Sequence, residues 1–115
     1  MEMNTVYNLD DEVIGIFRFG VAWSKNPRVR LGEYDDDFVY SNDGNVLAKI
    51  GDNTVMDIIG ETIGQFDNYD LLISGKTVGK CIGNIGARAA AIVFLFSNNA
   101  AHNKSLKSDA ASGAA

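Results

Sequence analysis

The most concentrated set of chemically capable side chains in this sequence is acidic. Asp35-Asp36-Asp37 closely follows Glu33, and carboxylate oxygens are the ligands that Ca²⁺ prefers. The nearby Asn42-Asp43-Gly44 does not fit the spacing of an EF-hand loop, because Val39 stands at its first ligand position. We therefore interpret the run 35–37 as a solvated acidic turn, with calcium binding as the alternative, and we predict no metal site.

Further aspartates stand near predicted turns and offer acid–base chemistry. A carboxylate-based hydrolase needs two acids about 5 to 9.5 Å apart in a cleft, and symmetry could gather these residues into one. Turn formation explains them better, because aspartate bonds readily to its own backbone. The residues are Asp10, Asp11, Asp43 and Asp57.

Nucleophilic catalysis is disfavoured by the small number of histidines and cysteines. His102 is the single histidine and Cys81 the single cysteine, so neither a Cys-His pair nor a zinc site has enough ligands. Cys81 stands where other repeats carry large apolar residues, and we interpret it as a core residue rather than a reactive thiol. We predict no enzyme, no catalytic residues and no cofactor.

A phosphate-binding loop is suggested by Gly75-Lys76-Thr77 but fails on spacing. A Walker A loop needs a glycine five residues before Gly75, where this chain has Asp70. No helix-forming stretch follows to present amide donors to a phosphate. We interpret the segment as a turn followed by a strand.

Aromatic side chains are the most suggestive feature for binding. Tyr7, Trp23 and Tyr40 occupy the same position in successive repeats. Burial in the core is the default expectation for such residues, and an exposed ring that stacks on a sugar or a peptide is the alternative. Together with Asp35, Asp36 and Asp37, they are our candidate contacts for a ligand or partner.

Composition narrows the class of protein. The chain has 115 residues, is 46% hydrophobic and carries a net charge of −5, which favours one globular domain and disfavours binding to nucleic acid. Its first residues are acidic, unlike a signal peptide, and its longest apolar run, Ala89 to Phe96, is too short to span a bilayer. With one cysteine, a cytoplasmic location without membrane attachment is expected.

A repeat of about sixteen residues organises the chain. The phrase apolar-small-x-large recurs five times, and its small residue falls at Gly15, Gly32, Ala48, Gly64 and Gly79. A second apolar run precedes each of these residues by about eight to ten positions, and turn-forming residues separate the two halves. Each unit therefore reads as a β-hairpin, and the chain as an all-β protein.

Side chains alternate between the two faces of a strand, so the small residues share a face with large ones two positions on. Glycine weakens a strand unless another group approaches it closely, so the repeat indicates a crowded centre. Single hairpins are marginally stable, and five of them must pool their apolar faces. We favour a radial arrangement or a small closed barrel-like sheet over a linear solenoid.

The C-terminal part is the least regular. Ala89 to Phe96 falls where a sixth repeat would begin, and we predict a strand that closes the sheet beside the N-terminal hairpin. A short helix is the competing interpretation, because alanines precede the β-branched and aromatic residues. The predicted domain is 1–96, followed by a disordered tail at 97–115 that is rich in Ser, Ala and Asn.

Residues "VYSNDGNVLAKIGDNTVMDIIGETIGQF" resemble the bacterial 4-fold β-flower domain, in which phrases of the type Tyr-x-x-x-Gly-x-x-Val-Ala-x-Ile recur. The resemblance covers roughly Val6 to Gly86. It implies hairpins around a pseudo-four-fold axis, no established activity and no catalytic residues. This chain departs from it in having five repeats.

Two functions are therefore expected ahead of catalysis. The first is a non-catalytic binding or protein-interaction module for an unknown protein or a small polar ligand. The alternative is a structural module that self-associates as a homo-oligomer, through an exposed strand edge or the segment Ala89 to Phe96. A carboxylate-based hydrolase ranks last.

Overall fold

The computed structural model describes residues 4–97, which form ten β-strands and two helical segments. The predicted all-β class is confirmed. The strands are β1 (Asn4–Asn8), β2 (Val13–Arg18), β3 (Val21–Ser24), β4 (Arg30–Tyr34), β5 (Phe38–Tyr40), β6 (Val46–Gly51), β7 (Thr54–Asp57), β8 (Thr62–Asp67), β9 (Asp70–Ile73) and β10 (Lys76–Ile82). The helical segments are α1 (Ile85–Ala91) and η1 (Ile92–Phe96).

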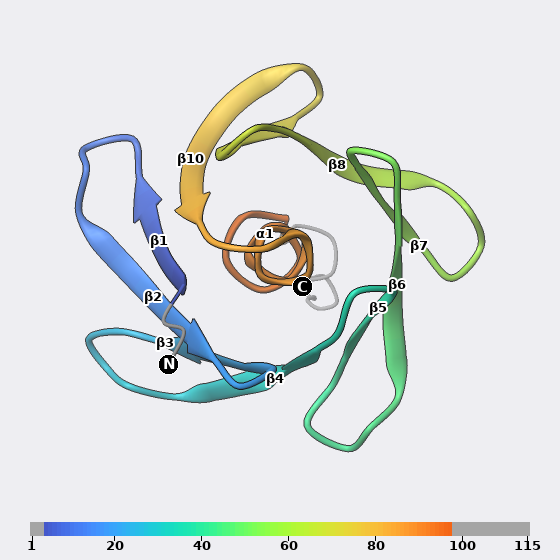
Figure 1. Cartoon of the computed structure of the whole chain (residues 1–115), viewed down its shortest axis with the longest axis horizontal. Helices are drawn as coiled ribbons and strands as arrows, with labels where there is room; N and C mark the ends of the chain where they lie inside the picture. The colour runs from blue at the N-terminus through green and yellow to red at the C-terminus, as the bar shows by residue number, and fades with distance from the viewer. Residues whose placement is uncertain (1–3, 98–115) are drawn as a thin grey trace, which may run out of the picture.

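The strands close into one antiparallel barrel, in which each strand pairs with its neighbours in sequence and β1 pairs with β10. Consecutive strands form five hairpins, which we number from the N-terminus: β1–β2, β3–β4, β5–β6, β7–β8 and β9–β10. Seen along the barrel, the hairpins surround the helical segment (Figure 1). This is the radial closure predicted from the repeat, with five units rather than four.

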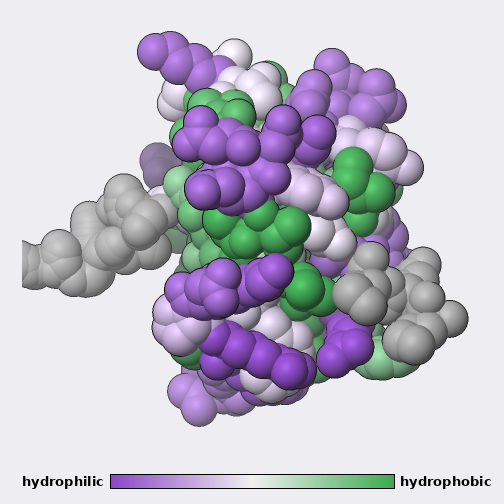
Figure 2. Space-filling view, turned by 90° about the vertical axis from the view of Figure 1, so that its left-hand side faces the viewer, coloured by the Kyte–Doolittle hydropathy of each residue, from purple (hydrophilic) through white to green (hydrophobic). Residues whose placement is uncertain are grey.

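The two faces of the strands divide as the repeat predicts. The small residues and the large residues two positions on face inward, and Phe17, Phe66 and Cys81 are almost fully buried. The first strand of each hairpin contributes one further fully buried apolar residue: Val6, Ala22, Val39, Val55 or Leu71. The outer surface near β1 and β2 mixes hydrophilic and hydrophobic side chains and presents no single broad apolar face (Figure 2).

A β-bulge recurs at the same place in every hairpin and gives the repeated phrase a structural meaning. In the first hairpin Val6 pairs with Gly15 and Tyr7 with Val13, so Ile14 is the extra residue. The same shift in the other hairpins makes the extra residue the apolar one before the small one: Leu31, Leu47, Ile63 and Val78. Bulges bend a strand and increase its twist, which helps short strands curve into a narrow barrel.

The chain enters the barrel through a polar junction. Asn84 caps α1, because its side chain accepts a hydrogen bond of 2.9 Å from the amide of Ala87. The buried side chain of Asn4 accepts from the amide of Asn84 and donates to the Tyr34 hydroxyl and the Phe17 carbonyl. These bonds join the first strand to the point where the helix begins.

The strand predicted at Ala89 to Phe96 is wrong. These residues end α1 and form η1, and four residues of the run, Ala89, Ala90, Ala91 and Ile92, are fully buried. The sheet is already closed by the pairing of β1 with β10, so a further strand has no place in it. A short apolar run fits a buried helix as well as a buried strand. Here the run lies in the centre of a closed barrel, where no strand edge is free to pair with it, and it forms a helix.

The glycine positions make room for η1 and for neighbouring backbone. A Cβ atom at Gly79 would lie 2.5 Å from Cζ of Phe96, and one at Gly64 would lie 2.8 Å from Cγ2 of Ile92. At Gly15 it would lie 2.9 Å from Cδ1 of Leu95. The same three positions also face a carbonyl oxygen of the next hairpin, so a side chain is excluded from two directions. The crowded centre that the repeat predicts is therefore confirmed.

Residues of η1 meet the hairpins in order around the barrel. Ile92 faces the fourth hairpin, Phe94 the second, Leu95 the first and Phe96 the fifth. In the third hairpin Ala48 replaces glycine, and Val93, which packs against the core, has the smallest side chain of η1. A π-helix bonds i to i+5, as the 2.8 Å bond from the Ser97 amide to the Ile92 carbonyl shows. Four of the five residues of η1 thus each face a different hairpin.

The predicted disordered tail at 97–115 lies, except for Ser97, outside the described residues, as does His102. Ser97 is the C-terminal cap of η1, and its hydroxyl donates a 2.9 Å hydrogen bond to the Val93 carbonyl. Within residues 4–97 no helix is long and apolar enough to cross a membrane.

Substituting the inward glycines tests this packing. Gly32→Ala and Gly79→Ala should each lower the free energy of unfolding by about 1–3 kcal/mol, because the new methyl collides with an η1 ring and a carbonyl. Urea unfolding followed by circular dichroism measures the change. Gln65→Ala, on the exposed face of β8, is the control and should stay within about 0.5 kcal/mol. Equal effects at all three positions would contradict the packing.

Candidate ligand-binding groove

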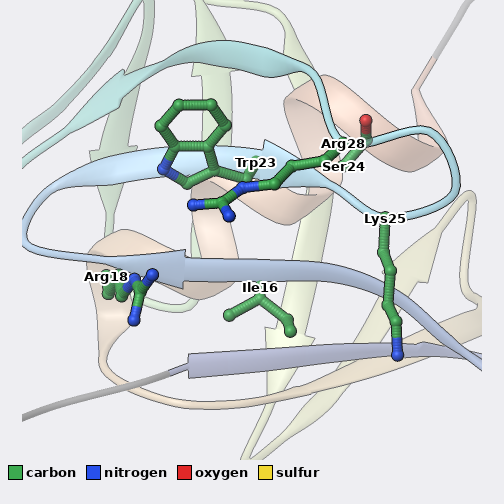
Figure 3. Close-up of a pocket in the computed structure, with 6 residues that line it drawn as sticks. All are labelled: Ile16, Arg18, Trp23, Ser24, Lys25 and Arg28. Atoms are coloured by element: carbon green, nitrogen blue, oxygen red, sulfur yellow. The ribbon is translucent and has the colours of Figure 1, made fainter.

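A groove lies on the outside of the barrel between the first and second hairpins. It has a volume of about 330 Å³, within the range of small-molecule sites. Residues of β2, of β3 and of the loop after β3 line it (Figure 3). We call it the Trp23 groove, and its residues are Ile16, Arg18, Trp23, Ser24, Lys25 and Arg28.

The floor of the groove follows from strand pairing. Ile16 of β2 is the direct partner of Trp23 of β3. Their chain neighbours Phe17 and Ala22 are fully buried in the barrel, so alternation turns Ile16 and Trp23 outward. An aromatic and a β-branched side chain facing each other across two strands is a stabilising pair, and it gives the groove an apolar floor.

Ser24 holds the loop that covers one side of the groove. Its hydroxyl donates a 2.7 Å hydrogen bond to the Pro27 carbonyl and accepts one of 3.1 Å from the Val29 amide. The Lys25 amide donates to the Ile14 carbonyl over 3.0 Å, which ties the loop to the first hairpin. The loop thereby places the Arg28 guanidinium carbon 4.8 Å from the centre of the Trp23 ring, a cation–π arrangement.

Positive charge gathers in this groove although the chain is acidic overall. Arg18, Lys25 and Arg28 all line it, and within residues 4–97 none of the three forms an ion pair with an acidic side chain. Arg18 and Lys25 stand at its two ends with Ile16 between them (Figure 3). A net charge of −5 makes this local concentration of three unpaired cations unusual for the molecule.

These groups suit a particular chemistry. The exposed part of an indole favours a flat or apolar ligand surface, and arginine binds carboxylate and phosphate oxygens with a planar fork of donors. A ligand with a ring and an anionic group would satisfy both. The residues that line the groove include neither a carboxylate nor a thiol.

Comparison with protein-family models, curated proteins and solved structures found no match. Function therefore has to be inferred from the geometry itself.

The three predicted aromatic contacts do not form one site. Tyr7, Trp23 and Tyr40 are half-buried and lie on the outer faces of β1, β3 and β5, not in the core as the default expectation held. Lys80 places its ammonium 5.4 Å from the centre of the Tyr7 ring, and Tyr40 binds Asp35. Of the three, Trp23 lines the groove described above.

The acidic run forms the turn that the sequence predicts. One carboxylate oxygen of Asp35 accepts hydrogen bonds of 2.8 Å from the amides of Asp37 and Phe38, and the other accepts one of 2.6 Å from the Tyr40 hydroxyl. The Tyr40 bond holds the pKa of Asp35 below its ordinary value, and the same bond raises the pKa of Tyr40. Asp36 and Asp37 are exposed.

No group of three or more His, Cys, Asp or Glu side chains among the described residues is placed to hold a metal ion. Neither of the two hollows described among residues 4–97 brings the aspartates near the hairpin turns together. The Trp23 groove contains none, and a second hollow, beside Met56, contains Asp57 alone. The paired-carboxylate hydrolase thus has no site in these two places.

Sequence reasoning missed the groove's cations. Arg18, Lys25 and Arg28 fall within residues 18–30, a segment that also holds Arg30 and contains no acidic residue. This local excess of positive charge was one usable signal. The other was the pairing of two predicted strands across the Phe19-Gly20 turn, which sets Ile16 against Trp23 and brings Arg18 to the same face.

Cys81 gives a direct test of the core assignment. Its thiol is fully buried, and burial raises its pKa to about 12, with a smaller opposing effect of Arg88. We expect dithionitrobenzoate at pH 8 to label native protein more than about 100-fold more slowly than urea-unfolded protein, because reaction requires the barrel to open. Rapid labelling of the native protein would place Cys81 at an accessible site and contradict this assignment.

Proposed function

We propose that this protein is a non-catalytic binding module that takes a small anion carrying a flat ring into the Trp23 groove. The observation that carries the proposal is the Arg28 guanidinium, held 4.8 Å from the Trp23 ring centre beside two further unpaired cations. Loop hydrogen bonds at Ser24 hold this arrangement in place without a ligand, and preorganisation of this kind favours binding.

Charge is central to the proposal. Arg18 and Lys25 at the ends of the groove attract an anionic group, while Trp23 and Ile16 contact the ring. The acidic remainder of the protein repels long polyanions, so the proposed ligand is a small molecule rather than a nucleic acid. We place the protein in the cytoplasm as part of the same proposal, on the basis of its single buried cysteine.

We also propose that the chain is a five-hairpin relative of the 4-fold β-flower domain. Five hairpins arranged around one axis (Figure 1) support this proposal. The 4-fold β-flower family has no established activity, so this relationship implies no activity for the chain.

Trp23 is the only tryptophan, so its fluorescence reports directly on the groove. We expect adenosine 5′-monophosphate, which has both a ring and an anion, to change this fluorescence saturably with a dissociation constant below about 1 mM. Adenosine lacks the anion and inorganic phosphate lacks the ring, so each should bind at least about tenfold more weakly. Calorimetry of the same three titrations provides a second readout.

Substitutions then assign the binding to the groove. Arg28→Ala and Arg18→Ala should each weaken binding of the monophosphate by about tenfold, the usual loss for one charge-assisted hydrogen bond. Lys76→Ala removes the same charge from an exposed residue of β10 outside the groove and should change little. Equal binding of the monophosphate and adenosine, or equal loss in all three variants, would contradict the proposal.

A further inference from the structure

The hairpin turn after β7 is unusually apolar for its position. Ile58 and Ile59 form its tip and are 74% and 76% exposed. Val46 lines the same hollow as Ile58 and Ile59, and Val46 and its neighbour in sequence, Leu47, are 42% and 37% exposed. A hollow of about 450 Å³ lies next to the tip, with Phe38, Met56 and Lys49 in its lining. We call these residues together the Ile58 patch.

Folding does not require an apolar tip here, as two equivalent turns show. In the fourth hairpin the Asp57 carboxylate accepts hydrogen bonds from the amides of Ile59 and Glu61, and the Gly60 amide donates to the Asp57 carbonyl. The third hairpin makes the same three bonds around Ser41, with Asn42-Asp43 at its tip.

The first hairpin repeats the pattern around Asn8, with Leu9-Asp10 at the tip. All three turns also have a residue with positive φ at the same place, namely Asp11, Gly44 and Gly60. The backbone thus forms the same turn over polar and apolar residues alike. Two isoleucines exposed to water at such a tip need a reason other than folding.

Charges around the Ile58 patch complement one another. Lys49 and Asp57 both line the hollow, and Glu61 follows the tip after Gly60. Within the described residues neither Lys49 nor Glu61 takes part in an ion pair. The patch therefore has an exposed apolar tip that forms one wall of a hollow, with Lys49 and Asp57 in the lining of that hollow and Glu61 nearby in sequence.

We propose that the Ile58 patch binds the same patch of a second copy of this chain, related by a two-fold axis. In such an isologous contact each tip enters the other copy's hollow, and each Glu61 faces the other copy's Lys49. The closed barrel leaves no free strand edge within residues 4–97, and the segment Ala89–Phe96 lies inside it. Self-association of this chain therefore uses a face of the barrel.

The interface is small. Stable dimers bury about 800 Å² on each partner. The four exposed apolar side chains of the patch, Val46, Leu47, Ile58 and Ile59, would cover only the central part of such an interface. The net charge of −5 on each copy opposes association at long range. We therefore expect a dissociation constant of roughly 10–100 µM, which tightens when salt screens the overall repulsion.

Sedimentation equilibrium of the full chain, from about 5 to 500 µM, tests the proposal. We expect a monomer–dimer equilibrium. Replacing the tip with the residues of the third hairpin, in Ile58→Asn/Ile59→Asp, should weaken it at least tenfold without unfolding the turn. Leu9→Asn is the matched control: it removes an exposed apolar residue, 68% exposed, from the equivalent turn of the first hairpin and should leave the equilibrium unchanged.

A charge exchange tests the two-fold arrangement. Lys49→Glu and Glu61→Lys should each weaken the dimer several-fold, and the double variant should restore it, because both pairs are re-formed across the axis. Circular dichroism confirms that each variant is folded. A strictly monomeric protein at about 500 µM would overturn the proposal, as would a dimer that the tip substitution leaves intact or a charge exchange without recovery.

Discussion

The interior of this barrel is filled by the chain's own C-terminal helical segment, and the rest of the structure depends on that packing. A hollow ring of five hairpins would leave the inward faces of its strands exposed to water. Residues 85–96 fill this space. Side chains of η1 approach the strands so closely that a methyl group is excluded at four of the five small inward positions, namely Gly15, Gly32, Gly64 and Gly79. The repeated glycine is thus a steric requirement of the centre, and no phosphate or cofactor is needed to explain it.

The same packing bears on where a ligand could bind. The inward faces and the lumen are packed with apolar side chains, so the two contacts that we propose lie on the outer faces of the strands and on the turns of the hairpins. Turns with one shared hydrogen-bonding scheme around Asn8, Ser41 and Asp57 vary freely at their tips. The Trp23 groove and the Ile58 patch both occupy such places, where side chains can change without disturbing the core.

Much of this architecture could be predicted from the sequence because its cause is local and periodic. The spacing from Gly15 to Gly79 identified five hairpins, and the alternation of side chains identified their inner face. Asp35 was correctly interpreted as a turn residue, since aspartate bonds to amides two and three positions on. The first apolar residue of each repeated phrase is the extra residue of a β-bulge, but this could be recognised only from the strand pairing.

Features that depend on distant parts of the chain could not be predicted in this way. Whether Ala89–Phe96 is a strand or a helix depends on whether β10 has already closed the sheet with β1, and no local pattern records that. The groove was missed for a similar reason. Arg18 and Arg28 line one groove because β2 pairs with β3, while Trp23 was one of three aromatic candidates that the repeat placed at the same position.

The most direct test of the central claim is a double-mutant cycle between a strand glycine and the η1 residue that it faces. Gly15→Ala should destabilise the protein when Leu95 is present and much less in a Leu95→Ala background, because the new methyl then occupies the space that Cδ1 vacates. Urea unfolding of the four proteins should give a coupling free energy of about 1 kcal/mol or more. Effects that add to within about 0.3 kcal/mol would mean that η1 does not pack against the glycine, and would contradict the account.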